Sequence, residues 1–318
     1  MNVGVTGASG FIGTALVRRL CQDKNLNVKA FTRQPSGQGS WGNLEVEIIP
    51  DLQSGRSIES SLRGIDTLIH LAARAHVSAK TNADIDNVKS INIEGTRKLA
   101  LDAKKAGVKR FIFLSSIKAM TDDTSEALPI TERSRVAPKD VYGVSKLEAE
   151  NVLLEIARKS RSFEVIIIRP PLIYGPGVKA NFLKIVNLVK SGLPLPFLGI
   201  NNKRSVLFLY NLTDFIELLL KQTRLKSTVF LVKDERDLST SELCSEIADS
   251  LAIKVRQFYI PPKLLKIGFA ILGKQSVGDR LLGSLQVDDR DTLAELNWKP
   301  KYSIEEALKM TLTTTKRI

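Results

Sequence analysis

The chain has 318 residues, of which 43% are hydrophobic and 6% aromatic, enough apolar content for one large domain or two unequal ones. With 47 Lys and Arg against 34 Asp and Glu, the net charge of +13 favours anionic partners, such as nucleotides, nucleic acid or an acidic membrane surface. Basic runs interleaved with aromatic residues do not occur, so nucleic acid is not an expected partner. No segment reaches the roughly 20 apolar residues of a membrane span, and the N-terminus does not read as a signal peptide. Two distant cysteines, Cys21 and Cys244, suit a reducing compartment, and we therefore expect a cytoplasmic protein.

The first predicted element is a strand over Asn2–Thr6, which runs into a glycine-rich turn and then a helix over Thr14–Cys21. The turn reads GASGFIG and has its glycines at G-x-x-G-x-x-G spacing. Gly7 permits a tight turn, Gly10 lets the backbone approach a pyrophosphate, and Gly13 lets the helix and strand pack closely. The N–H groups and the positive dipole end of the helix face the same phosphates. Strand, turn and helix in this order predict a dinucleotide site.

Apolar strand-like segments then alternate with helical segments through the first half of the chain. Further strands are predicted at Asn27–Thr32, Val46–Ile49, Thr67–Leu71, Arg110–Ser115 and Glu164–Ile168, with helices at Ile91–Ala106 and Val141–Lys159 among them. This alternation predicts an α/β fold with a Rossmann-type, doubly wound parallel sheet.

After residue 170 the pattern changes to helices mixed with short strands. We assign residues 1–175 to a dinucleotide-binding domain and 176–318 to a smaller, discontinuous α+β substrate lobe. A strand near 205–232 is expected to return to the main sheet. The helices predicted in this half are Phe182–Lys190, Leu212–Lys221 and Ser241–Leu251.

Tyr142 and Lys146 stand four residues apart and therefore on one face of the helix predicted at 141–159. A tyrosine hydroxyl titrates near ~10, and a lysine ammonium one turn away lowers that pKa and prepares the hydroxyl for proton transfer. The strand upstream ends in Ser115 and Ser116, at the sheet edge where ligands bind.

The glycine loop, the strand-end serines and the Tyr-x-x-x-Lys motif, in this order, resemble the extended short-chain dehydrogenase/reductase family, in its NAD-dependent epimerase/dehydratase branch. The resemblance covers nearly the whole chain, and it implies Ser116, Tyr142 and Lys146 as catalytic residues. The implied cofactor-binding residues are Gly7, Ser9, Gly10, Phe11, Ile12, Gly13, Asp51, Leu52, Leu71, Ala72, Ala73, Asn92, Ser115, Tyr142, Lys146, Arg169 and Pro170.

The second lobe is similar to nucleotide-sugar epimerases, and most similar to a bacterial polysaccharide subgroup that acts on UDP-N-acetylated, often 6-deoxy, hexoses. The resemblance implies a UDP-sugar substrate with its diphosphate held by Asn181 and Arg204, besides Ser116 at the sugar. Arg280 is either a further phosphate contact or a solvated helix charge. The family likeness also implies a homodimer through the helices at 91–106 and 141–159.

Two departures from the family pattern bear on the reaction. The strand predicted at 27–32 is followed by Arg33 rather than an acid, which favours the 2′-phosphate of NADP over the ribose of NAD, unless Arg33 is only a solvated loop residue. Ser116 is followed by Ile117 and Lys118 rather than an Asp-Glu pair, which disfavours dehydration.

Three functions follow from this comparison. The favoured one is reduction of a UDP-4-keto-6-deoxy sugar by NADPH, because Arg33 suits NADP. The alternative is a UDP-hexose or UDP-N-acetylhexosamine 4-epimerase with tightly held NAD. The least favoured is a catalytically idle NAD(P)-binding regulator or scaffold.

The two histidines and one apolar segment are interpreted as structural rather than functional features. His70 and His76, the only histidines, are interpreted as structural or loop residues, and no cluster with metal-ligand spacing occurs. The apolar, lysine-bracketed segment 262–274 is interpreted as a helix that packs within its own lobe, with docking to an acidic membrane or a partner enzyme as the alternative.

Overall fold

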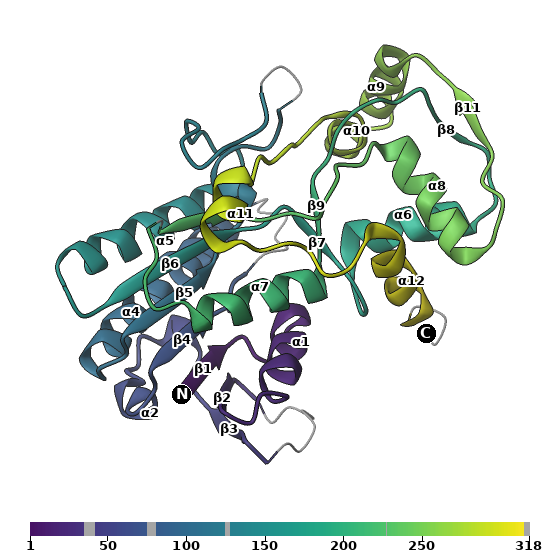
Figure 1. The fold of residues 1–318 in the computed structure, drawn as a ribbon. Coiled ribbons are helices and arrows are strands. Elements are labelled where there is room, and N and C mark those ends of the chain that lie inside the picture. The colour runs from purple at the N-terminus through teal and green to yellow at the C-terminus, as the bar shows by residue number, and fades with distance from the viewer. Residues whose placement is uncertain (35–41, 75–80, 125–127, 227, 315–318) are drawn as a thin grey trace. The chain divides into compact units, whose positions relative to one another are not determined.

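The computed structural model describes residues 1–34, 42–74, 81–124, 128–226 and 228–314, and it divides the chain into two compact units (Figure 1). The first unit contains residues 1–122, 134–170 and 213–231. The second contains residues 123–133, 171–212 and 232–318. Each unit is described by itself below.

The first unit is built on a parallel sheet of seven strands in the order β10-β6-β5-β4-β1-β2-β3, which confirms the predicted fold class. The strands are β1 (Asn2–Thr6), β2 (Asn27–Thr32), β3 (Leu44–Ile48), β4 (Thr67–His70), β5 (Arg110–Leu114), β6 (Glu164–Arg169) and β10 (Val229–Leu231). The six earlier strands lie within two residues of their predicted bounds. The apolar runs of β4, β5 and β6 mark strands that are buried on both faces, whereas the edge strand β3 alternates glutamates with apolar residues and is partly exposed.

Helices α2 (Glu59–Leu62), α4 (Thr96–Lys105) and α5 (Val141–Arg158) cover one face of this sheet (Figure 1). Phe111 and Phe113 of β5 belong to the same apolar cluster as these helices, whereas Ile112 is equally buried but outside that cluster. This alternation is the period of two expected of a strand with both faces covered.

Helices α1 (Phe11–Leu20) and α7 (Leu209–Lys221) lie together in the view of Figure 1 and are joined by Arg19. The Arg19 guanidinium lies 3.2 Å from the Asp214 carboxylate and 2.5 Å from the Glu217 carboxylate. Helix α1 begins at Phe11 rather than at the predicted Thr14, so Gly13 lies inside its first turn.

One predicted helix is irregular. The segment expected as a single helix over 91–106 follows α3 (Asn82–Lys89) as a π-helical turn, η2 (Ser90–Gly95), and only then becomes α4. Such turns often occur at functional sites, and η2 contains the candidate residue Asn92.

The second unit combines helices with two small parallel sheets, β7–β9 and β8–β11. Its elements are β7 (Leu172–Tyr174), α6 (Ala180–Lys190), β8 (Leu195–Leu198), β9 (Val206–Phe208), α8 (Thr240–Leu251), β11 (Gln257–Tyr259), α9 (Pro262–Ile271), α10 (Gln275–Leu282), α11 (Arg290–Leu296) and α12 (Ile304–Thr314). The short helical turns η1 (Leu52–Ser54) and η3 (Ile117–Ala119) belong to the first unit.

The unit boundaries differ from a single division at residue 175. Residues 123–133 join the second unit, because Thr124 N–H donates to the Ser284 carbonyl at 2.8 Å and Ile130 N–H donates to the Gln286 carbonyl at 2.9 Å. The segment that returns to the first unit is 213–231, so β10 lies in the main sheet while β9 pairs with β7. Within the described ranges, no helix has both the length and the apolar character needed to cross a membrane.

Candidate active site

The glycine loop between β1 and α1 is a close-packed backbone cradle. Gly7 has φ +70°, and a Cβ added there would lie 2.7 Å from the Ala72 backbone nitrogen. A Cβ at Gly13 would lie 2.1 Å from the Gly7 carbonyl oxygen. Gly10 stands at the N-cap of α1, whose first turn therefore begins without a side-chain cap among the described residues. The loop thus presents backbone N–H groups where a phosphate can approach, with Ser9 and Gly10 exposed and Phe11 and Ile12 half-buried.

The loop after β4 crosses this cradle and is fixed by Asn92. The Asn92 side chain accepts a hydrogen bond from Arg74 N–H at 2.9 Å and donates one to the Ser145 hydroxyl at 2.9 Å. The half-buried residues Leu71, Ala72 and Ala73 therefore lie between β4 and a fixed point at Arg74. Asn92 is buried and holds the loop in place, so its structural contribution to the cofactor site is to position this loop.

His70 at the end of β4 is structural, as interpreted from the sequence. Its ring nitrogens lie 2.7 Å from the Thr6 hydroxyl and 3.0 Å from the Thr96 hydroxyl, and its ring stacks on Phe113. Complete burial, together with the nearby charge of Lys146, lowers the pKa of His70 to about 3. The imidazole is therefore neutral at physiological pH and ties β1, β4 and α4 together.

Ser116, Tyr142 and Lys146 meet at the carboxyl end of β5. Ser116 caps η3, and the half-buried Tyr142 side chain hydrogen-bonds to Ser116. The Lys146 ammonium donates to the Leu114 carbonyl at 2.8 Å and lies 5.9 Å from the centre of the Tyr142 ring. Helix α5 places both residues on one face because they are separated by about one turn. The structure therefore assembles the three residues into one cluster.

The pKa of Tyr142 differs from the sequence-based expectation. Burial and the negative charge of Asp140 raise the pKa of Tyr142 above its ordinary value, and the hydrogen bond with Ser116 only partly opposes this. Burial also lowers the pKa of Lys146 to about 7, although Glu150 opposes that shift. A lysine that is only partly protonated at neutral pH is a weaker positive neighbour than the full ammonium assumed from the motif.

A buried carboxylate behind these residues was missed by the sequence reasoning. Glu150 lies one further turn along α5, accepts a hydrogen bond from the Ser115 hydroxyl, and pairs with Arg169 of β6. The Arg169 Nε lies 3.0 and 3.2 Å from the two Glu150 carboxylate oxygens. The i, i+4, i+8 spacing of Tyr142, Lys146 and Glu150 is the signal that could have revealed it.

The Glu150 carboxylate binds two of the predicted cofactor residues, Ser115 and Arg169. Ser115 and Arg169 are both buried, and their polar groups are directed to Glu150. The neighbouring Pro170 carbonyl accepts from Ile117 N–H at 2.9 Å, which joins the end of β6 to η3. The three residues thus hold the strand ends on which Ser116 stands.

The adenine-side candidates lie around η1. Asp51 caps η1 by accepting from Gln53 N–H at 2.9 Å, and its other oxygen accepts from the Arg33 guanidinium at 2.9 Å. The bond from Gln53 and the pairing with Arg33 lower the pKa of the Asp51 carboxyl below its ordinary value. Arg33 therefore already has an anionic partner within the chain.

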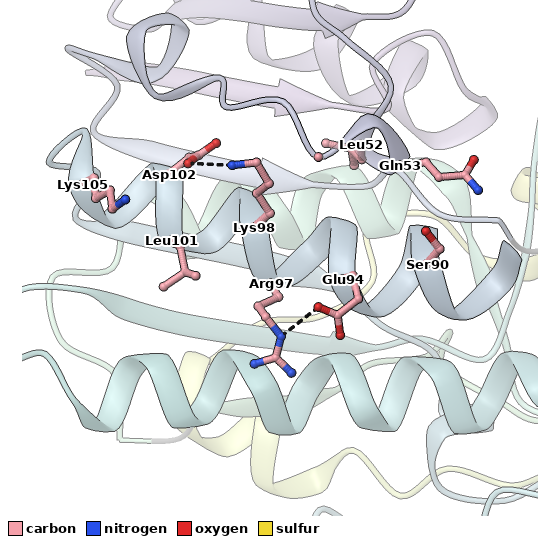
Figure 2. A pocket seen from close by; sticks show the side chains of 10 residues that line it. Leu52, Gln53, Ser90, Glu94, Arg97, Lys98, Leu101, Asp102 and Lys105 are labelled. Atoms are coloured by element: carbon pink, nitrogen blue, oxygen red, sulfur yellow. Dashed lines mark hydrogen bonds and ion pairs between the residues drawn. The ribbon is translucent and has the colours of Figure 1, made fainter. Parts of the chain in front are cut away.

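Leu52 packs on Gly95, where an added Cβ would lie 3.0 Å from the Leu52 Cβ. Leu52 also borders a shallow hollow of about 320 Å³ between η1 and α4, shown in Figure 2. Four of the charged residues in that hollow form ion pairs, Lys98 with Asp102 at 3.6 Å and Arg97 with Glu94 at 3.2 Å. None of the three catalytic candidates borders it, so it is a separate feature of the outer helices.

The predicted substrate residues other than Ser116 belong to the second unit. Arg204 is half-buried, and its guanidinium donates to the Gly283 carbonyl at 3.0 Å. Burial lowers the pKa of Arg204, Asp123 opposes the shift, and repulsion from Arg280 adds to it. The exposed Arg280 donates from Nε to the Ser276 carbonyl at 2.8 Å. Asn181 stands in the first turn of α6, and its side chain lies outside the described residues, as does the whole of His76.

Comparison with known proteins identifies the family. The profile of the NAD dependent epimerase/dehydratase family matches residues 3–232. The chain belongs to this family. It is 40% identical over 309 residues to a UDP-glucose 4-epimerase of Vibrio cholerae, covering 96% of this chain and 93% of that protein.

Two further relatives bear on substrate and cofactor. An Escherichia coli O157:H7 protein is 30% identical over 279 residues, which is 86% of this chain and 80% of that one. Its name is N-acetyl-alpha-D-glucosaminyl-diphospho-ditrans,octacis-undecaprenol 4-epimerase. Among solved structures, MoeE5 in complex with UDP-glucuronic acid and NAD superposes with a TM-score of 0.80 at 25% identity, over 100% of this chain and 99% of that one.

The residues of the first unit fit the dinucleotide that the family name implies. The cradle at Gly7 and Gly13 has no room for a side chain, and Asp51, the adenine-side candidate, caps η1. In the described part of the chain, no group of three or more His, Cys, Asp or Glu residues is arranged to hold a metal ion.

Proposed function

We propose that this enzyme is an NAD-dependent 4-epimerase of a UDP-linked hexose or N-acetylhexosamine. The observation that carries the proposal is the near full-length, 40% identity to a UDP-glucose 4-epimerase, joined to the assembled Ser116, Tyr142 and Lys146 cluster. These features support the alternative reached from the sequence better than the 4-keto reduction that the sequence analysis favoured.

The three clustered residues would act on the C4 hydroxyl of the sugar. Tyr142 takes the proton of that hydroxyl as the 4-keto sugar forms and returns it when the alcohol is rebuilt on the other face. Ser116 would hydrogen-bond the same oxygen and orient it. Tyr142 can accept the proton only as the phenolate, which burial disfavours in the free protein, so the protonated form of Lys146 would supply the positive charge that stabilises it. The chemistry that NAD supplies when bound is the removal and return of hydride at C4.

The argument for NADP, and with it for reduction, rested on Arg33 as a free cation. The bond of 2.9 Å to Asp51 gives Arg33 a carboxylate partner, and a 2′-phosphate would have to compete with that carboxylate. An NAD-holding epimerase recycles its cofactor and needs no such phosphate contact. We therefore infer NAD as the cofactor.

The second unit supports a diphosphate-containing substrate. Arg204 and Arg280 repel one another, and the half-buried Arg204 is unfavourably desolvated. A diphosphate between these two cations would relieve both effects, since each guanidinium can donate two hydrogen bonds to the oxygens of a phosphate. We propose Arg204 and Arg280 as its ligands and Asn181 as a third contact.

The test is a turnover assay on the purified protein without added NADPH. UDP-glucose, UDP-N-acetylglucosamine and the polyprenyl diphosphate-linked sugar are supplied separately, and the C4 epimers are separated by chromatography. Interconversion without net cofactor consumption supports an epimerase. A separate arm contains NADPH and a UDP-4-keto-6-deoxy sugar. Stoichiometric NADPH oxidation in that arm, with no epimer formed in the others, would instead establish the reductase, and no turnover in any arm would favour the idle regulator.

We also propose that the enzyme is a homodimer through α4 and α5, the helices that the family likeness implies. Light scattering of the protein in solution would show twice the mass of a single chain if this is so. A monomeric mass would contradict it.

A further inference from the structure

Helix α9 of the second unit carries a row of exposed large apolar side chains. Leu264, Ile267 and Ile271 are 58%, 54% and 81% exposed. Their spacing of three and four residues places them on one face of the helix. Single exposed apolar residues are common, but a continuous row of this kind marks an interaction surface.

The opposite side of α9 already provides its attachment to the second unit. Leu265 is buried, and the half-buried Phe269 packs against Gly278 of α10, where an added Cβ would lie 2.9 Å from the Phe269 Cβ. The predicted packing of this segment within its own lobe is therefore achieved by Leu265 and Phe269. The exposed row is not needed for it.

Positive charge adjoins the apolar row. Lys263 and Lys266 lie three residues apart on the flank of α9, and Lys274 follows the helix end. Lys266 pairs with Asp279 at 3.8 Å, whereas the side chains of Lys263 and Lys274 form no ion pair with the described residues. The chain as a whole carries +13.

We propose that the exposed face of α9 docks on an anionic lipid membrane surface. A helix with an apolar face beside a lysine-rich flank lies in the membrane interface with its apolar side chains among the acyl chains and its lysines at the head groups. At 10 residues α9 is too short to span a bilayer, so it would lie in the interface plane. The charge complementarity favours anionic lipid over a neutral surface or a second copy of this basic chain.

The test is co-sedimentation of the full-length protein with vesicles of 70% phosphatidylcholine and 30% phosphatidylglycerol, compared with pure phosphatidylcholine, at 20 mM and 500 mM salt. We expect binding to the anionic vesicles at low salt and weak binding in the other conditions, because salt screens the lysines. Absence of binding to anionic vesicles at low salt would overturn the proposal.

Two substitutions with matched controls locate the surface. Ile267→Glu should weaken vesicle partitioning at least about tenfold, since burial of a large apolar side chain contributes this much or more. Ile48→Glu, at a residue 56% exposed in β3, should leave it unchanged. Lys263→Glu should weaken partitioning about fivefold or more, while Lys24→Glu, also at an exposed lysine, should change it less.

The experiment distinguishes lipid from protein partners and is independent of the proposed reaction. If Ile267→Glu leaves vesicle binding intact but changes the mass measured by light scattering, α9 is an interface between copies and the lipid proposal is wrong. Turnover of a soluble UDP-sugar is measured on the same variants, and it should remain that of the unaltered protein.

Discussion

The two units hold their polar residues in different ways. In the first unit, the reactive residues are surrounded by partners from the same unit: Glu150 pairs with Arg169, His70 lies between two threonines, and Asn92 holds a loop. In the second unit, Arg204 is desolvated by burial and repelled by Arg280, and Asp123 offsets these effects only in part. The first arrangement is complete without a ligand, whereas the second is improved by an anion. Substitutions should therefore affect chemistry and stability in the first unit and substrate affinity in the second.

The largest effect is expected at Tyr142. Tyr142→Phe removes only the hydroxyl that transfers the proton, and turnover should fall by about 10²–10⁴-fold. Cofactor affinity measured by calorimetry should stay the same, because the ring and its packing remain. Near-normal turnover in this variant would remove Tyr142 from the mechanism.

The next effect is expected at Glu150, where positioning and charge act together. Glu150→Gln leaves the buried Arg169 without its counter-ion and should lower the free energy of unfolding by about 1–3 kcal/mol. Because Glu150 raises the pKa of Lys146, the variant should titrate Lys146 below its value of about 7. NMR of isotopically methylated lysine would follow this titration.

Glu155→Gln is the matched control, since Glu155 lies on the same helix but pairs with the exposed Lys159 at 2.6 Å. It should change neither the titration of Lys146 nor the turnover. An unchanged Lys146 pKa in Glu150→Gln would mean that Glu150 acts only as a packing residue.

A substitution in the second unit should weaken binding of the UDP-sugar without slowing the chemical step. Arg204→Met should raise KM for the UDP-sugar about tenfold or more with kcat little changed, because one charge-assisted phosphate contact is lost. The exposed Arg256→Met serves as a control of equal charge change. A fall in kcat equal to the rise in KM would break the proposed contrast between the units.

The last prediction concerns acid stability and His70, and it leaves activity at neutral pH unaffected. Its pKa is about 3 in the folded chain against an ordinary value of 6.5, so between these values the unfolded chain binds the extra proton. Stability should therefore fall as the pH falls through this window, by about 1.4 kcal/mol per pH unit from this residue. Urea unfolding of the protein and of His70→Gln from pH 7 to 4 measures it, and the variant should show a shallower acid slope. Identical slopes would contradict the assignment.

Sequence reasoning reached the first unit because its signals are local. Continuous apolar runs mark β4, β5 and β6, and the four-residue spacing of Tyr142 and Lys146 places both on one helix face. Contacts between distant segments were not accessible in this way. The pairing of Arg33 with Asp51 joins two loops, and the bond of Thr124 to Ser284 spans 160 residues of sequence. The first contact weakens the inference of NADP drawn from Arg33, and the second moves residues 123–133 into the second unit.

The pKa values of Tyr142 and Lys146 also could not be predicted from the sequence alone. A Tyr-x-x-x-Lys motif gives the spacing of the two groups but not their desolvation, which acts on each of them separately. Burial makes the tyrosine harder to ionise and the lysine easier to neutralise, so the free protein does not present the phenolate-ammonium pair that the motif suggests.

The returning segment 213–231 has a consequence for how the chain can be made. Strand β10 covers the edge of β6, and the Arg110 guanidinium binds the carbonyls of Leu219 and Gln222 at 2.8 Å. During synthesis, the first unit therefore stays incomplete until the ribosome has passed residue 231, and the apolar β6 remains an open edge in the meantime. Open apolar edges invite pairing with other chains. A fragment ending near residue 175 would keep that edge permanently, so the cofactor-binding half of this enzyme is not a module that can be cut free.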